Sequence, residues 1–154
     1  LATAYFRSHA PATLQDFSWW SGLPLTEARQ SISLIEPKLM SEQWNSQTWY
    51  IHDSCRTSGK ATGNLHLLPP YDEYLIGYKD RTDVLPKEDY SKAFTNNGLF
   101  FPVLLYKGHV VGNWNKASKK KEIFPEHSLF RKDICLKEEL LNQAKEKYVR
   151  FLIH

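Results

Sequence analysis

Leu67 to Arg81 reads Leu-Leu-Pro-Pro-Tyr-Asp-Glu-Tyr-Leu-Ile-Gly-Tyr-Lys-Asp-Arg, and this stretch decides how the chain is organised. Its two prolines fix the backbone and remove two amide donors, so the interior of a regular helix cannot begin before Tyr71. Three tyrosines and a leucine then recur at three- and four-residue spacing, which places them on one face of a helical turn. We interpret the stretch as a rigid corner that joins two lobes, and we predict these joint residues: Pro69, Pro70, Tyr71, Asp72, Tyr74, Gly77, Tyr78 and Arg81.

The composition is that of a folded protein. The chain has 154 residues, of which 42% are hydrophobic and 14% aromatic, so it can bury a core. We predict one lobe over residues 1–64 and a second, beginning near the corner, over residues 65–154. No apolar run approaches the roughly 20 residues of a membrane-spanning helix and no signal peptide opens the chain, so we expect a cytoplasmic protein without a membrane partner. The chain opens on Leu1 rather than methionine, as a part of a longer protein would.

The sequence carries no motif for a common catalytic chemistry. The six histidines have no metal-ligand spacing, and Cys55 and Cys135 form no Cys-x-x-Cys pair, so we predict no metal site, no disulfide and no cofactor. Motifs for phosphate cradling and acyl transfer are also missing. The acidic side chains around the corner favour helix capping or ion pairing over an acid/base pair, and they are Asp72, Glu73, Asp80 and Asp83. We therefore predict no catalytic residue in this chain.

The first lobe reads as three helices followed by two strands. A short helix over 2–9 ends before Pro11, and Thr13 to Asp16 matches a capping box that starts a second helix, which ends at Gly22. The third helix, over 25–35, has an apolar stripe expected to face the core, consisting of Leu25, Ala28, Ile32 and Ile35. Strands over 39–40 and 48–51, with a polar loop over 41–47 between them, complete a winged-helix pattern, and an exposed loop over 52–64 follows.

Two helices joined by a short turn indicate a helix-turn-helix, whose last helix enters a DNA major groove. The outward side chains that we predict to contact DNA from this helix are Thr26, Arg29 and Gln30. This face is polar rather than strongly basic, and the net charge of +3 is too small to indicate nucleic-acid binding alone. A three-helix unit without DNA contacts therefore remains an alternative.

The second lobe reads as mostly strands. After a helix over 84–94 and a turn over 96–98, strands over 99–106 and 109–114 flank the two-residue turn Lys107-Gly108. The first of these strands is almost wholly apolar, which suggests burial on both faces or closure into a small barrel, with Pro102 at an edge or bulge. A short strand over 123–124 ends at Pro125, and an amphipathic helix over 136–153, expected to be structural, closes the chain.

The densest basic stretch lies before the last strand. It contains Lys116, Lys119, Lys120 and Lys121, which form either a solvated loop or a set of contacts to phosphates. The predicted fold class is thus α+β: a winged helix joined to a small antiparallel β-barrel-like lobe with a C-terminal helix.

Several of these segments resemble one family. They are the corner itself, Asn97-Gly98 before an apolar strand, Lys107 to Trp114, Tyr5-Phe6, Thr13-Leu14, Asp16-Phe17, Trp19 to Leu23, and Ala28-Arg29. Together they resemble the winged-helix DNA-binding-domain proteins that include alkylpurine and crosslink-unhooking DNA glycosylases. The resemblance implies tandem winged helices, a small barrel, and a catalytic glutamine-hydrophobic-glutamine or -aspartate motif that lies nearer the family's N-terminus than this chain reaches. Gln43-Trp44-Asn45 imitates that motif only by coincidence.

The leading functional hypothesis is a module that binds double-stranded DNA. We expect backbone contacts from the six cations Arg29, Lys38, Lys116, Lys119, Lys120 and Lys121, in what is either the C-terminal portion or a shortened relative of a glycosylase-like protein. One alternative is a base-excising glycosylase that acts on alkylated or crosslinked DNA as part of a longer protein. A second alternative is a structural or partner-binding lobe that makes no DNA contact.

Overall fold

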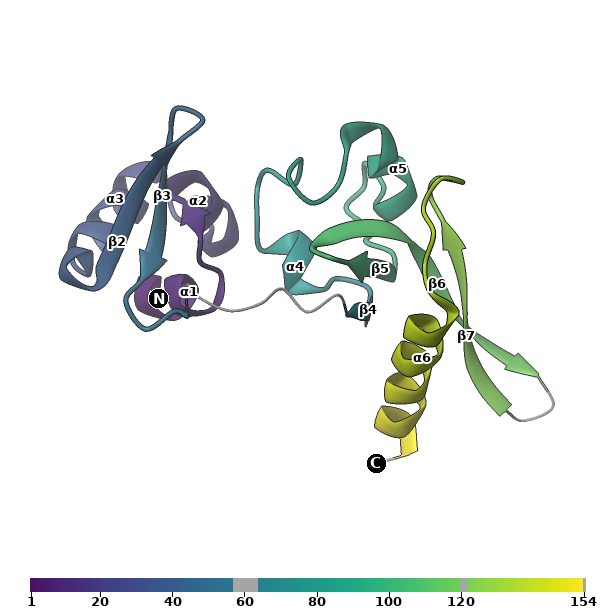
Figure 1. Ribbon diagram of the computed structural model, residues 1–154. Coiled ribbons are helices and arrows are strands. Elements are labelled where there is room, and N and C mark those ends of the chain that lie inside the picture. Colours follow the sequence, from purple (N-terminus) through teal and green to yellow (C-terminus); the bar gives the residue numbers. More distant parts are fainter. Residues whose placement is uncertain (57–63, 120–121, 154) are drawn as a thin grey trace. The chain divides into compact units, whose positions relative to one another are not determined.

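The computed structural model of the chain describes residues 1–56, 64–119 and 122–153 (Figure 1). The chain divides into two compact units, one formed by Leu1–Lys60 and Glu73–Asp80 and the other by Ala61–Asp72 and Arg81–His154. The predicted lobe boundary between residues 64 and 65 stays a prediction. None of the helices in the described ranges is both long and apolar enough to cross a membrane.

The first unit packs three helices against a three-stranded antiparallel sheet. Its elements are, in chain order, α1 (Ala2–Ser8), β1 (Ala12–Thr13), α2 (Leu14–Ser21), α3 (Leu25–Ser33), the 3-10 turn η1 (Glu36–Lys38), β2 (Leu39–Trp44) and β3 (Gln47–His52). The strand order is β1-β3-β2, so β3 is the central strand. A further short helix of this unit, α4 (Glu73–Ile76), comes from the corner.

The capping box of α2 is confirmed. The Thr13 hydroxyl accepts a hydrogen bond from the Asp16 amide at 3.2 Å, and the Asp16 carboxylate accepts one from the Thr13 amide at 2.9 Å. Gly22 ends the helix with φ 71°, a left-handed conformation that glycine adopts without steric cost. Local chemistry at each end therefore fixes the length of α2.

The predicted polar loop over 41–47 is wrong. Strand β2 continues to Trp44 and β3 begins at Gln47, which leaves a turn of only two residues. Asn45 and Ser46 both have positive φ, 49° and 61°, as a type I′ hairpin turn requires. The polar side chains of residues 41–43 lie on an exposed edge strand, where polarity does not prevent pairing.

The core of the first unit is aromatic. Tyr5, Phe6 and Phe17 are fully buried, and the ring of Phe17 lies 5.3 Å from Tyr5 and 5.5 Å from Phe6. Helix α3 adds Ala28 and Ile32 to this cluster. Leu25 was expected there, but it is 49% exposed because it is the first residue of α3, ahead of the turn that packs inward.

Helix α4 and the residues after it bind to this core through hydrogen bonds. The Tyr78 hydroxyl donates to the carbonyl of His9 at 2.7 Å, and the Tyr5 hydroxyl donates to the carbonyl of Gly77 at 2.9 Å. The backbone amide of Lys79 donates to the Asp16 carboxylate at 2.9 Å. The segment 73–80 is thus held at three separate places in the first unit.

Burial changes the acidity of these tyrosines. It raises the pKa of Tyr78 to about 12, with further contributions from Asp16 and Tyr74, and it also raises the pKa of Tyr74. The pKa of Tyr5 is raised as well, by burial first and then by the carboxylate of Asp16. These hydroxyls therefore remain protonated hydrogen-bond donors at neutral pH.

The predicted helical face of the corner is only partly correct. Leu75 is buried, but α4 is a single turn that starts at Glu73. Tyr71 lies outside it with φ 60° and is 50% exposed, so the prediction that this tyrosine shares a helical face with the others is wrong. The prolines confine the helix to a position beyond Tyr71, which shortens the periodic run.

The second unit is an open four-stranded antiparallel sheet with helices. Its elements are β4 (Leu65–Leu68), the 3-10 turn η2 (Lys87–Asp89), α5 (Tyr90–Ala93), β5 (Val103–Tyr106), β6 (His109–Lys119), β7 (Glu122–Leu129) and α6 (Glu138–Ile153). The strand order is β4-β5-β6-β7, so β4 and β7 are edge strands and the predicted closed barrel is wrong. The predicted helix over 84–94 forms only as η2 and α5.

Both faces of β5 are nevertheless buried. Leu104 belongs to a cluster that includes Trp114 and residues of α6, and the neighbouring Val103 and Leu105, which point to the other face, are also buried. The apolar run was therefore correctly interpreted as a strand buried on both sides. Packing against other elements, rather than closure of the sheet, covers it.

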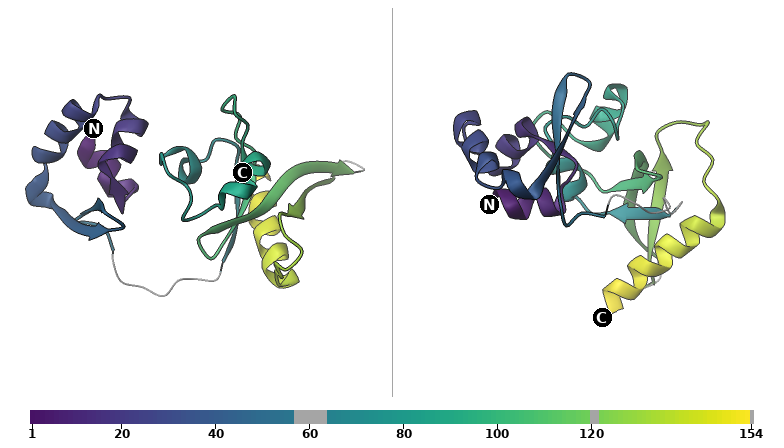
Figure 2. Two further views of the ribbon diagram at one scale, coloured as in Figure 1. Left: turned by 90° about the horizontal axis from the view of Figure 1, so that it is seen from above. Right: turned by 60° about the vertical axis from the view of Figure 1, so that its left-hand side comes forward.

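The hairpins of this sheet differ in how well the sequence predicts them. The turn Lys107-Gly108 is confirmed, with φ of 51° and 82°. Strand β5 is shorter than expected because it begins only after Pro102. Strand β7 does not end at Pro125 but runs through it, because an edge strand tolerates a residue without an amide donor. Strands β6 and β7 form a long paired ribbon (Figures 1 and 2).

Replacing Gly77 with alanine should destabilise the first unit. An added Cβ would lie 2.6 Å from the Glu73 carbonyl oxygen and 2.7 Å from the His9 ring, which stacks on Tyr5. We expect Gly77→Ala to lower the free energy of unfolding by about 2–3 kcal/mol in urea denaturation.

Gly22→Ala is the matched control, because an added Cβ at Gly22 meets no atom within 4 Å. Only its left-handed backbone opposes the change, at about 1 kcal/mol. An equal or smaller loss for Gly77→Ala would contradict the packing described for segment 73–80.

Candidate nucleic-acid interface

Helix α3 presents a polar face to solvent. Thr26, Arg29 and Gln30 are exposed, and their spacing of three and four residues places them side by side on the helix. Ala28 and Ile32 lie on the opposite, buried face. The geometry thus brings together the three residues that the sequence assigned to DNA contact from this helix.

Two cations of the first unit are available for an external anion. Arg29 is exposed on α3 and Lys38 is exposed at the end of η1, where its carbonyl accepts a hydrogen bond from the Asp53 amide at 2.9 Å. In the part of the chain that the structure describes, neither side chain forms an ion pair. Exposed cations without a carboxylate partner can neutralise phosphates.

Other cations are already engaged. Lys92 and Arg131 both pair with the buried carboxylate of Asp89, at 2.7 Å and 3.2 Å. Burial alone would raise the pKa of Asp89, but the hydrogen bonds and charges of these two partners outweigh it, and the pKa lies below its ordinary value. We therefore assign Lys92 and Arg131 to the fold rather than to an interface.

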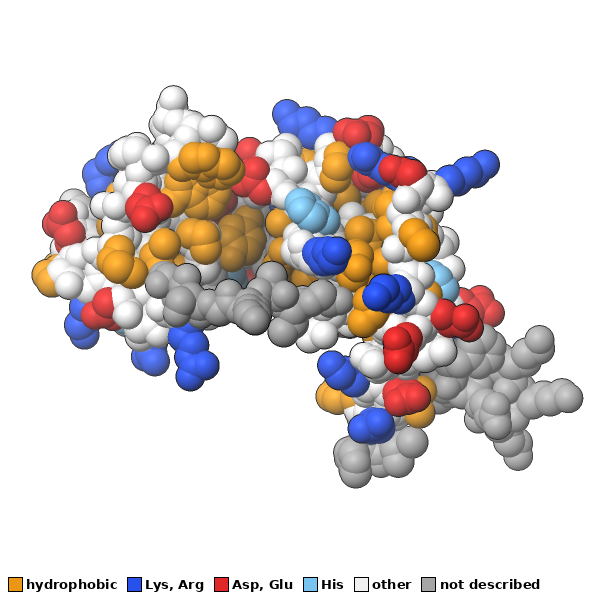
Figure 3. Space-filling model, in the orientation of Figure 1, with side chains coloured by type: hydrophobic (Ala, Val, Ile, Leu, Met, Phe, Trp, Pro, Cys, Tyr) orange, Lys and Arg blue, Asp and Glu red, His pale blue; other side chains and the backbone are white. Residues whose placement is uncertain are grey.

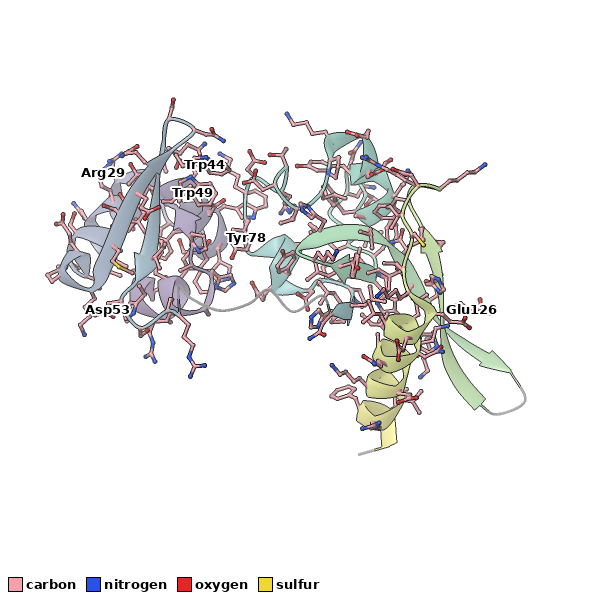
Figure 4. All side chains as sticks on the ribbon, in the orientation of Figure 1. Arg29, Trp44, Trp49, Asp53, Tyr78 and Glu126 are labelled. Carbon is pink, nitrogen blue, oxygen red and sulfur yellow. The ribbon has the colours of Figure 1, made fainter. Side chains whose placement is uncertain are left out.

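The tip of the β2–β3 hairpin carries a tryptophan that sequence reasoning missed as a functional residue. Trp44 is 55% exposed, and its ring lies 5.9 Å from that of Trp49 on the paired strand (Figure 4). Hydrophobic side chains gather over this hairpin on the face that Figure 3 shows. The two-residue turn Asn45-Ser46 was the signal that could have placed Trp44 at a hairpin tip rather than in a loop. An exposed aromatic ring beside amides can stack on a base or on a sugar.

The sequence Gln43-Trp44-Asn45 lies at this same tip. The amide of Gln43 donates to the Thr48 hydroxyl across the hairpin at 2.7 Å. Asn45 occupies the turn itself. These side chains serve hairpin geometry, which agrees with the interpretation that the similarity to a catalytic motif is a coincidence.

The basic stretch of the second unit falls on the β6–β7 hairpin. Lys116 is exposed on β6, directly opposite Pro125 of β7. Lys119 is the last residue of β6, but its side chain, together with Lys120 and Lys121, lies outside the described residues. The predicted DNA contacts of these four lysines stay predictions.

The predicted joint residues divide between the two units. Pro69, Pro70, Tyr71, Asp72 and Arg81 belong to the second unit, and Tyr74, Gly77 and Tyr78 to the first. The guanidinium of Arg81 lies 5.4 Å from the ring centres of both Phe94 and Phe100, so its charge is buried against aromatic faces. The role of these residues as a joint stays a prediction.

Glu73, one of the acidic residues of the corner, makes structural contacts. The Glu73 carboxylate lies 3.2 Å from the ring nitrogen of His9 and accepts a hydrogen bond of 3.2 Å from the Trp20 indole. Within residues 1–56, 64–119 and 122–153, no cluster of three or more histidine, cysteine or acidic side chains could hold a metal ion.

Comparison with known proteins gives one family and one solved structure. The family model described as DNA glycosylase AlkZ-like matches residues 1–151. The structure of Streptomyces sahachiroi DNA glycosylase AlkZ is similar with a TM-score of 0.77 at 20% sequence identity, over 93% of this chain. This chain spans only 39% of that protein's length. No curated protein matches the sequence.

Proposed function

Because the chain belongs to the AlkZ-like DNA glycosylase family, we propose that it is the DNA-binding part of a glycosylase-like protein and has no complete catalytic site of its own. The observation that carries this proposal is the exposed polar face of α3. Its Arg29 forms no ion pair in the described part of the chain. A three-residue turn joins α2 to α3, and a hairpin follows. The family match over residues 1–151 supports duplex DNA as the ligand.

We interpret the first unit as a winged helix. Its element order, helix-strand-helix-helix-strand-strand, and its strand order β1-β3-β2 support this interpretation. In it, α3 is the helix presented to the major groove, and β2 and β3 form the wing. Thr26, Arg29 and Gln30 then contact base edges or phosphates, and Trp44 lies at the tip of the wing.

The phosphate contacts explain affinity rather than sequence preference. Arg29, Lys38 and Lys116 are exposed single cations on three different elements, and the lysines at the end of the β6–β7 hairpin would add to them. Contacts to phosphate oxygens position a protein on the duplex without reading bases. We therefore propose a module that holds DNA mainly by its backbone.

Base excision by a longer protein is the second candidate function. The similarity to DNA glycosylase AlkZ favours it, and so does the family itself. In this candidate the chain holds the duplex while another part of the protein supplies the catalytic groups. An excised base would have to leave the stack, which costs a few kcal/mol that contacts between protein and DNA must offset.

Binding of a fluorescently labelled 20-base-pair duplex should be detectable at low salt and should weaken steeply as salt rises. If the protein neutralises three phosphates, raising the salt from 50 to 200 mM should weaken binding about 40-fold. Fluorescence anisotropy measures both quantities. Absence of binding at 50 mM salt would overturn the proposed function.

Arg29→Ala should weaken duplex binding by about five- to tenfold and lower the salt-dependence slope by about 0.9, since one phosphate contact is lost. Arg7→Ala is the matched control, because Arg7 is an exposed arginine on α1 of the same unit. Equal effects of the two substitutions would show that α3 has no special part in binding.

The isolated chain should release no base from alkylated duplex DNA. A full-length glycosylase of the same family is the positive control, and base release is followed by cleavage of the abasic strand and gel electrophoresis. Release above the background of buffer alone would contradict the absence of a complete catalytic site and would favour the second candidate function.

A further inference from the structure

The β6–β7 hairpin presents one of its faces to helix α6. Trp114 of β6 belongs to the cluster that contains Ala144, and its ring lies 4.8 Å from that of Tyr148, so Trp114 points toward α6. Alternate residues of a strand share a face, and so do residues directly opposite each other in an antiparallel pair. Lys116, two residues after Trp114, and its partner Pro125 therefore lie on this same face.

A groove with a volume of about 440 Å³ runs between this face and α6. It is lined by Pro125, Asn142, Lys145, Glu146, Val149 and Arg150. Val149 gives it a partly exposed apolar side chain, whereas Pro125 is fully buried, and its polar groups are an amide, two cations and one carboxylate. This combination suits a sugar-phosphate backbone, which has apolar sugar faces and anionic oxygens.

The groove has more cations than carboxylates. Lys145 and Arg150 line the groove with one carboxylate, Glu146, and Lys116 lies opposite Pro125, which also lines it. The pair of Glu146 with Arg150 is long (3.4 Å), and both side chains are mostly exposed. Such exposed pairs contribute about 0–1 kcal/mol and rearrange readily. Glu126 is opposite Asn115 and so lies on the other face of the hairpin (Figure 4).

The charge of Lys145 on α6 affects His127 of the hairpin. His127 is opposite Trp114 and hence on the face toward α6. Partial burial lowers the pKa of His127, and the charge of Lys145 lowers it further. The histidine is therefore neutral at pH 7, and it adds no charge of its own to the groove.

We propose that the groove between β7 and α6 binds the phosphates of one DNA strand, with contacts from Lys145 and Arg150 of α6 and from Lys116, which lies beside the groove opposite Pro125. This inference rests on the proposed function and adds α6, which the sequence marked as structural, to the DNA-binding surface. Helix α6 contributes Lys145 and Arg150 to the groove, while Ala144 and Tyr148 pack on the sheet. In this proposal one helix both completes the core and contributes to binding.

Two substitutions that remove the same charge separate a local contact from the overall field. Glu146→Gln removes the carboxylate from the groove, and Glu126→Gln removes one from the opposite face. At 50 mM salt we expect Glu146→Gln to tighten duplex binding about threefold and Glu126→Gln to change it by less than about 1.5-fold. Equal tightening by both would overturn the proposed groove.

A second pair of variants tests the cations directly. Lys145→Ala with Arg150→Ala should lower the salt-dependence slope by about 1.8, the value for two phosphate contacts. Lys132→Ala with Lys137→Ala, which removes two exposed lysines that precede α6, should lower it by less than about 0.5. Alanine favours a helix, so circular dichroism should show α6 retained.

The outcomes distinguish the two proposals. If the unmodified chain fails to bind duplex DNA at 50 mM salt, the proposed function fails and the groove inference fails with it. If the chain binds and the two double variants have equal slopes, only the groove inference is overturned. A larger slope change for the pair on α6, together with the expected difference between the two glutamine variants, supports it.

Discussion

One buried carboxylate organises the first unit. Asp16 accepts hydrogen bonds from the Thr13 amide at 2.9 Å, from the Thr13 hydroxyl at 2.7 Å and from the Lys79 amide at 2.9 Å. A buried carboxylate without partners would cost several kcal/mol, so the native fold must supply all three donors together. Two of them start helix α2, and the third comes from a segment more than sixty residues away. The start of α2 and the docking of segment 73–80 therefore depend on the same carboxylate, and α3 packs Ala28 and Ile32 into the core of this unit.

Features set by local chemistry could be predicted from the sequence. The capping box at Thr13, the end of α2 at Gly22 and the turn at Lys107-Gly108 each rest on a few adjacent residues. Features that depend on pairing between segments distant in the sequence could not be predicted. Asn45-Ser46 forms a turn without glycine, Pro125 lies inside a strand because that strand is at an edge, and the sheet stays open because other elements cover β5. The α+β class and the family resemblance are confirmed, whereas the closed barrel was wrong.

The candidate site shows the same division. Helical periodicity was enough to predict which residues of α3 face outward, and Thr26, Arg29 and Gln30 are exposed as expected. Trp44 was not predicted as a candidate because its exposure depends on where the hairpin turns. Lys145 and Arg150 were not predicted as candidates for a different reason. The polar side of an amphipathic helix is normally expected to face solvent. Only the structure shows that Pro125 of β7 lies beside part of this side of α6.

The pattern of charges also explains why a net charge of +3 says little about binding. Lys92 and Arg131 pair with the buried carboxylate of Asp89, and Arg81 is buried against aromatic rings. The cations that stay available lie on separate elements: Arg29 on α3, Lys38 after it, Lys116 on β6, and Lys145 on α6. A polyanion can contact such a dispersed set, whereas a small anion would need several cations at one point. Single cations spread over separate elements therefore suit an extended polyanion, as the DNA backbone that we propose as the ligand would be.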